Sequence, residues 1–201
     1  MRNLLLLILT AAAAYAQPAC PGFPNCLYVQ QQTYEYTTNT QNISYNDVSG
    51  TRRTVEITIR IPNRQGPLPV MIWAHGGGDG RNFEGASIGA LSDWSEFSAA
   101  AGYLTVSPAF HVRTIADKLP LCRHLGIPDT DCERFSELSW DRPFDMRAIM
   151  DALTTLNQAG PLQGRIDMAR IGIGGHSAGS SGTLSVAGAN REFLGTRYSG
   201  A

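Results

Sequence analysis

Two apolar patterns in the first half of the chain predict β-strands. Between positions 51 and 61 an apolar residue occupies every second position, at Val55, Ile57, Ile59 and Ile61. This period of two is typical of a half-buried strand, and it predicts an antiparallel strand near the edge of a sheet. Leu68–Ala74 is almost continuously apolar, which predicts a strand buried on both faces.

Helical spacing follows these strands. Residues 93–101 place Trp94, Phe97 and Ala101 on one face of a predicted helix. Tyr103–Val106 is a short apolar stretch that predicts another buried strand, which Pro108 is expected to stop. Residues 109–141 predict no regular element.

A longer helix is predicted to begin at Asp141-Arg142-Pro143, which combines an acidic cap with a proline in the first turn. Gly160-Pro161 is expected to end it. Its predicted apolar face consists of Met146, Ile149, Met150, Leu153 and Leu156.

The last predicted elements are a short strand at Arg170–Ile173 and a helix within Ala178–Ala189. Strands that alternate with helices favour a parallel sheet built from βαβ units. Such a sheet collects the carboxyl ends of its strands at one edge, where the sites of α/β proteins form.

Composition narrows the class of protein. The chain has 201 residues, of which 43% are hydrophobic and 16% charged, so one domain with an ordinary core is expected. The low charged fraction argues against an intrinsically disordered chain. The formal net charge is -1, which excludes the strongly basic surface of a nucleic-acid-binding protein.

The first residues resemble a secretory signal peptide. Arg2 precedes the apolar run Leu4–Ala14, and Ala14-Tyr15-Ala16 is a small-residue cleavage site. The run is shorter than the roughly 20 apolar residues that span a bilayer. We therefore expect residues 1–16 to be removed and residues 17–201 to be secreted or periplasmic, with no stable membrane span; an uncleaved anchor is the alternative.

Export changes the interpretation of the four cysteines. An even number of cysteines in an oxidising compartment favours disulfides, and four allow three pairings. Proximity in sequence favours Cys20–Cys26 and Cys122–Cys132. Neither pair has the C-x-x-C spacing of a zinc site, so no metal is expected.

The segment Gly175-His176-Ser177-Ala178-Gly179 is a G-x-S-x-G motif between a predicted strand and a predicted helix. That context is the one a nucleophile elbow requires, because the serine sits in a sharp, strained turn with its hydroxyl free. The flanking glycines would avoid clashes where the strand and the helix cross. The alternative is a Gly-Ser turn that opens an ordinary helix.

A second motif, His75-Gly76-Gly77-Gly78, follows the strand at Leu68–Ala74. Backbone N–H groups of such a loop can stabilise the negative charge that develops on an ester carbonyl oxygen. The expected donors are the N–H of Ala178 and one from Gly76 or Gly77. The alternative is that these glycines form only a flexible loop.

With these two motifs the sequence resembles the α/β-hydrolase superfamily, from the strand at Leu68 through the elbow helix. Asp141-Arg142-Pro143-Phe144-Asp145, ahead of the elbow, is similar to secreted esterases related to platelet-activating-factor acetylhydrolases and polyester hydrolases. The resemblance implies an α/β-hydrolase fold, with a mostly parallel sheet and flanking helices.

The same resemblance implies the chemistry. Ser177 would attack a small-molecule or lipid ester and form an acyl-enzyme. Ala178 and Gly77 would form the oxyanion hole, with Gly76 as a possible substitute for Gly77. No nucleotide, flavin or metal cofactor is implied, and the sequence predicts no oligomeric state.

The rest of the catalytic triad is missing from the expected place. In this fold the acid and the histidine follow the serine along the chain, yet no histidine follows Ser177 and Glu192 is the sole later carboxylate. His75 is expected to fix the conformation of the glycine loop and His176 to be a packing residue, and nothing supports His111 as the base. The hypothesis is that these residues are a fragment without the C-terminal part of the fold. A serine peptidase on the same fold and a non-catalytic binding protein are the alternatives.

Overall fold

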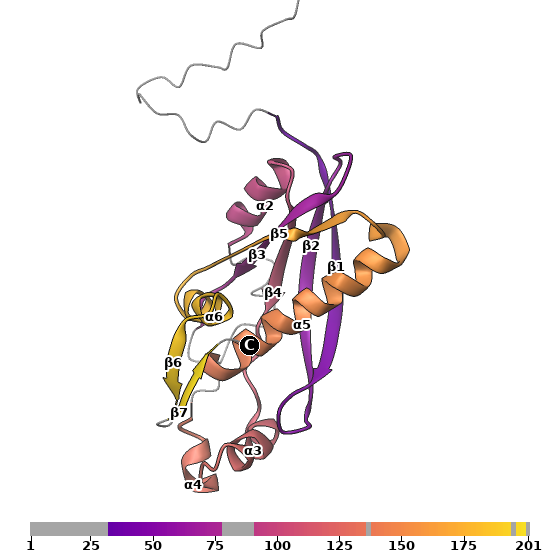
Figure 1. Ribbon diagram of the computed structural model, residues 1–201. Coiled ribbons are helices and arrows are strands. Elements are labelled where there is room, and N and C mark those ends of the chain that lie inside the picture. Colours follow the sequence, from indigo (N-terminus) through magenta and orange to yellow (C-terminus); the bar gives the residue numbers. More distant parts are fainter. Residues whose placement is uncertain (1–31, 78–90, 136–137, 194–195, 200–201) are drawn as a thin grey trace, which may run out of the picture. The chain divides into compact units, whose positions relative to one another are not determined.

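The computed structural model describes residues 32–77, 91–135, 138–193 and 196–199 (Figure 1). The chain divides into two compact units, residues 1–32 and residues 33–201, and the second is described below. The predicted signal peptide, the predicted Cys20–Cys26 pair and Gly78 lie outside the described residues.

A five-stranded mixed sheet forms the centre of this unit. Its strands are β1 (Tyr36–Asn46), β2 (Arg52–Pro62), β3 (Leu68–Ala74), β4 (Leu104–Ala109) and β5 (Ile166–Gly175). They lie in the order β1-β2-β4-β3-β5. The β1–β2 and β2–β4 pairs are antiparallel, whereas β3 pairs in parallel with both β4 and β5. The carboxyl ends of β3 and β5 therefore meet at one edge, as the alternation of strands and helices predicts.

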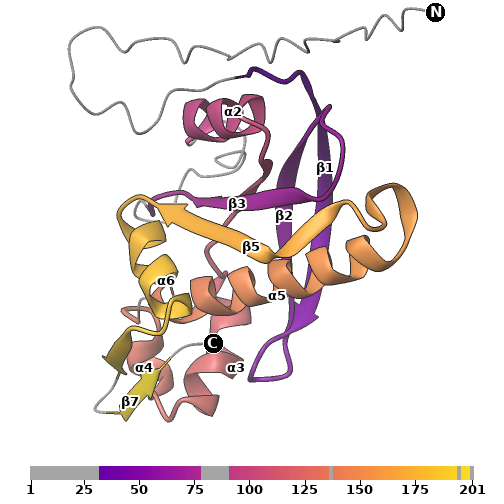
Figure 2. The same cartoon turned by 45° about the horizontal axis from the view of Figure 1, so that its top comes forward.

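Helices cover both faces of the sheet. Figure 2 shows α2 (Ser92–Ala100) on one face, with α5 (Leu138–Gln158) and α6 (Ala178–Val186) on the other. A short 3-10 helix, Gly160–Leu162, joins α5 to β5. None of the helices in the described ranges has both the length and the apolar character needed to cross a bilayer.

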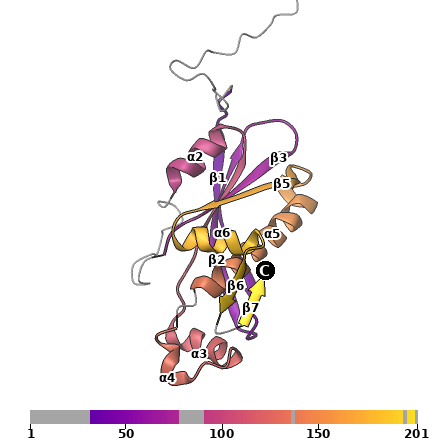
Figure 3. The same ribbon diagram turned by 60° about the vertical axis from the view of Figure 1, so that its left-hand side comes forward.

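Two further groups of elements lie outside the central sheet. Helices α3 (Ile115–His124) and α4 (Asp129–Cys132) lie together away from the sheet (Figure 3). A disulfide between Cys122 and Cys132 joins them, which confirms that predicted pairing. Strands β6 (Asn190–Phe193) and β7 (Thr196–Ser199) form a separate antiparallel hairpin.

The face of the sheet beneath α5 is apolar. Val55, Ile57 and Ile59 of β2 join the inward residues of β3 and β4 in one buried cluster. Helix α5 contributes Ile149 and Leu153 to this cluster, with Met150 and Leu156 packed against it. The predicted apolar face of this helix is thereby confirmed.

The opposite face is polar, which the sequence pattern did not predict. Ser95 of α2 accepts a hydrogen bond from Arg60 Nη1 and lies 3.0 Å from both Thr105 Oγ1 and Ser107 Oγ. Helix α2 packs small buried residues onto this face. Trp94 and Phe97 are 60% and 62% exposed, although the centre of the Trp94 ring lies 5.5 Å from that of Trp73 in β3, so the helix face predicted from their spacing is wrong.

Several element bounds also differ from those predicted. Pro108 does not stop β4, which continues to Ala109 by pairing with β2. Helix α5 begins at Leu138, so Pro143 lies inside it, and Asp141 pairs with arginines instead of capping the helix. Strand β5 begins at Ile166 and is longer than the predicted strand.

Candidate active site

The G-x-S-x-G segment forms a sharp turn between β5 and α6. Strand β5 ends at Gly175 and α6 begins at Ala178. Between them Ser177 has φ 53° and ψ −121°, a backbone conformation that costs of order 1–3 kcal/mol in residues with a side chain. Leu91 is the other residue besides glycine with positive φ in the described part of the chain. Ser177 is exposed at the tip of the turn.

The two glycines of the motif make this turn possible. A Cβ on Gly175 would come within 2.6 Å of the Gly179 carbonyl carbon, and one on Gly179 within 2.1 Å of the Ala74 oxygen. The first turn of α6 therefore lies directly against the ends of β3 and β5. The His176 N–H donates to the same Ala74 oxygen at 3.1 Å, which ties the turn to β3.

The glycine loop after β3 lies beside the serine. A Cβ on Gly76 would come within 3.4 Å of Ser177 Cβ and within 3.0 Å of His176 Nδ1. The structure therefore brings Gly76 next to Ser177, with Gly77 following along the loop. Ala178 begins α6 on the other side of the serine.

His75 holds this loop in position through hydrogen bonds of its side chain. Its side chain is buried, and its Nδ1 donates to the Gly76 oxygen while Nε2 accepts the Phe110 N–H at 3.0 Å. One ring nitrogen is a donor and the other an acceptor, so the ring is held neutral in one tautomer. Burial lowers the pKa of His75, and the nearby Arg142 cation lowers it further. His75 therefore holds the loop in place, as its position in the sequence predicts.

Comparison with known proteins adds to this geometry. No protein-family model and no curated protein matches the sequence. Among solved structures, a ferulic acid esterase from Streptomyces cinnamoneus aligns with a TM-score of 0.50 and 18% identity. That alignment covers 76% of this chain and 55% of the esterase. The chain has the α/β-hydrolase fold.

A second solved structure is a Klebsiella pneumoniae subsp. pneumoniae protein assigned as a dienelactone hydrolase. It aligns with a TM-score of 0.36 and 16% identity, over 69% of this chain and 50% of that protein. The chain thus spans about half the length of each of these two structures.

No catalytic base reaches the serine within this part of the α/β-hydrolase fold. Among the described residues, no side chain forms a hydrogen bond with the Ser177 hydroxyl. The side chains of His111, His124 and His176 are exposed, and His75 is committed to the loop. Ser177 and the glycine loop are therefore brought together here, but no histidine side chain of the described residues contacts the serine.

A buried cluster of charges supports the start of α5, and most of it was not predicted from the sequence. Arg53 of β2 forms two hydrogen bonds with Asp145, at 2.6 and 2.7 Å, and Tyr45 Oη donates to the same carboxylate at 2.7 Å. Arg113 pairs in the same way with Asp141, at 2.8 and 2.7 Å. Such bidentate pairs combine charge with fixed geometry.

The spacing of the two aspartates along the sequence indicates that they are buried. Asp141 and Asp145 continue the spacing of four that Ile149 and Leu153 follow along the buried side of α5. Carboxylates at core-facing positions require buried cations. The spacing does not reveal which arginines supply them, because Arg53 lies 92 residues before Asp145.

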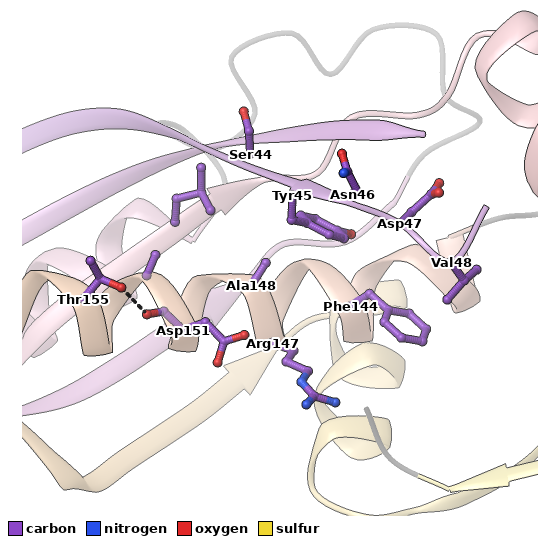
Figure 4. A pocket seen from close by; sticks show the side chains of 12 residues that line it. Ser44, Tyr45, Asn46, Asp47, Val48, Phe144, Arg147, Ala148, Asp151 and Thr155 are labelled. Atoms are coloured by element: carbon purple, nitrogen blue, oxygen red, sulfur yellow. Dashed lines mark hydrogen bonds between the residues drawn. The ribbon is translucent and has the colours of Figure 1, made fainter. Parts of the chain in front are cut away.

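A pocket of about 520 Å³ lies between residues 43–48 of β1 and the following turn and residues of α5 (Figure 4). Tyr45 and Phe144 line it together with the exposed side chain of Arg147. Neither Ser177 nor the glycine loop contributes to this pocket. The elbow, and not this pocket, is therefore the candidate active site.

Proposed function

We propose that the protein is a secreted carboxylic ester hydrolase in which Ser177 is the nucleophile. The observation that carries the proposal is the strained backbone of Ser177 beside the glycine loop, at the carboxyl ends of β3 and β5. Backbone strain at one exposed serine is typical of a functional site. The esterase among the similar folds supports carboxylic esters as the substrate class.

In the proposed reaction, Ser177 Oγ attacks the ester carbonyl and its proton passes to a base. The carbonyl oxygen becomes negatively charged, and the N–H groups of Ala178 and Gly77 would stabilise it, with Gly76 as the alternative donor. Each such donor lowers the barrier by roughly 3–4 kcal/mol. The alcohol leaves with a proton, and water then releases the acid from the acyl-enzyme.

The base for this proton is not among the groups that contact Ser177 in the described residues. A serine without a positioned base is a weak nucleophile. We therefore expect the 201 residues alone to hydrolyse esters very slowly. Appreciable turnover by these residues that depends on Ser177 would contradict it.

Secretion is part of the proposal. The Cys122–Cys132 disulfide supports an oxidising compartment, because such bonds are rare in reducing ones. N-terminal sequencing of the exported protein would test cleavage after Ala16.

A fluorophosphonate probe on the full-length protein tests the serine. We expect one adduct at Ser177, lost in Ser177→Ala, together with hydrolysis of short p-nitrophenyl esters. Hydrolysis of aminoacyl amides in preference to esters would favour a peptidase. The absence of an adduct on folded full-length protein would favour a non-catalytic binding protein.

A further inference from the structure

Arg142 is a buried arginine that reaches the glycine loop from α5. Its side chain is 1% exposed, and Nη1 donates a hydrogen bond to the His75 carbonyl oxygen. The guanidinium carbon lies 4.6 Å from the centre of the Phe110 ring. A Cβ on Gly182 of α6 would come within 3.0 Å of Arg142 Cβ, so α6 packs directly on the arginine stem.

Arg142 differs from the neighbouring arginines in its partners. Arg53 and Arg113 each form a bidentate pair with a carboxylate. The hydrogen bond of Arg142 goes to a backbone carbonyl instead, and its buried Nε has no hydrogen-bond partner in the described part of the chain. Burial lowers the pKa of Arg142 to about 10, so it remains a cation at neutral pH. A buried cation without a carboxylate partner is costly, which points to a specific use.

Peptide geometry indicates that use. In a trans peptide the C=O and the following N–H point in opposite directions, and the described backbone has no cis peptide. Arg142 holds the His75 carbonyl, so it sets the direction of the Gly76 N–H. His75 Nδ1 holds the Gly76 carbonyl, so it sets the direction of the Gly77 N–H. The directions of both candidate oxyanion donors, the Gly76 and Gly77 N–H groups, are therefore set by Arg142 and His75.

The sheet order distinguishes the two donors. The His75 ring also binds Phe110, the residue after β4, so the Gly76 carbonyl that it holds faces the β4 side. Strand β3 lies between β4 and β5. The Gly77 N–H then points toward the β5 side, where Ser177 lies, and this favours Gly77 as the second donor.

We infer that Arg142 is a positioning residue of the oxyanion hole, which orients the His75–Gly77 backbone by holding the His75 carbonyl. The inference rests on the proposed function for its catalytic consequence. The structural part of the inference, the orientation of the loop, does not depend on the proposed function, because it can be measured without turnover.

The test compares three variants of the full-length protein. Arg142→Met keeps an unbranched stem beneath α6 but removes the donors, and Arg142→Lys keeps the charge. Arg147→Met, at an exposed arginine on the same helix, is the matched control. Amide hydrogen exchange at Gly76 and Gly77 is measured by NMR against Val70 and Ile72 of β3. The rates of Ser177 phosphonylation and of p-nitrophenyl ester hydrolysis are measured in parallel.

In Arg142→Met we expect exchange at Gly76 and Gly77 to rise while exchange in β3 does not change. Phosphonylation and kcat should fall by about tenfold to a hundredfold with KM little changed, because the lost interaction acts in the transition state. Millimolar guanidinium should restore part of the rate. Arg142→Lys should lose less, and Arg147→Met should match the wild type.

Unchanged exchange at Gly76 and Gly77 in a folded Arg142→Met variant would overturn the inference. If that variant does not fold, Arg142→Leu, which likewise removes the donors, carries the same comparison, and wild-type exchange at both glycines would again overturn it. Absence of a Ser177 adduct in the wild type would instead refute the proposed function, and the exchange data would still decide the role of Arg142.

Discussion

Gly179 lies so close to Ala74 that a Cβ on the glycine would come within 2.1 Å of the alanine carbonyl oxygen. Both groups belong to the backbone, so the clash could be relieved only by a shift of α6 or β3. We expect Gly179→Ala to lower the free energy of unfolding by about 3 kcal/mol, as severe overpacking does. Urea denaturation measures this. Leu184→Ala, at an exposed position on the same helix, should change stability by only about 0.5 kcal/mol.

The buried pair of Arg53 and Asp145 should be sensitive to loss of one partner. Arg53→Met leaves a buried carboxylate without its main cation, which typically costs about 3–5 kcal/mol. The exposed pair of Arg123 and Asp129 is the control, and Arg123→Met there should leave the free energy of unfolding almost unchanged, because solvent screens the pair. Equal losses in the two variants would show that the buried pair has no special importance.

His75 should make stability depend on pH. Burial lowers its pKa in the folded protein, so below about pH 6.5 the unfolded chain takes up a proton that the folded chain resists. Stability conferred by the neutral ring is therefore present above that pH and is lost as the pH falls through it. His75→Gln removes this contribution.

The measurement compares unfolding free energies between about pH 8 and pH 5. The stability gap between wild type and His75→Gln should narrow as the pH falls. Leu184→Ala, which removes no titratable group, should show a constant gap. A constant gap for His75→Gln as well would mean that the ring takes up a proton without loss of the fold.

The strained backbone of Ser177 should lower the stability of the protein. Glycine adopts positive φ without a steric penalty, so Ser177→Gly should be more stable than Ser177→Ala by about 1 kcal/mol. Both variants should lose the fluorophosphonate adduct. Thermal unfolding of the pair measures the difference. If Ser177→Gly were the less stable variant, the backbone of Ser177 would not be strained.

The sequence predicted the elements around the site well. The strand predicted at Leu68–Ala74 has the same bounds in β3, because burial on both faces leaves an unbroken apolar run. The elbow was recognisable because so tight a turn between strand and helix requires glycines at fixed offsets from Ser177. Side chains from distant segments were harder to predict, because the partners of Asp141 and Asp145 come from separate elements.

Strand β1 and the buried polar face under α2 were not predicted from the sequence, and both have the same cause. Strand β1 lies at the edge of the sheet, and only Ile43 and Tyr45 of this strand pack against the core cluster. The face under α2 is held by hydroxyl groups and Arg60 instead of apolar residues. Apolar periodicity reveals neither β1 nor the face under α2, because hydrogen bonds hold both in place more than apolar contacts do.

The pairing of β3 with β5 also determines when the site can form. His176 reaches Ala74 across about a hundred residues of chain, and closing a loop of that length costs roughly 4 kcal/mol of entropy. Contacts of such high sequence separation form slowly. Ser177 and the glycine loop should therefore come together late in folding, after the antiparallel β1–β2 hairpin, so that the candidate site arises only in a nearly complete sheet.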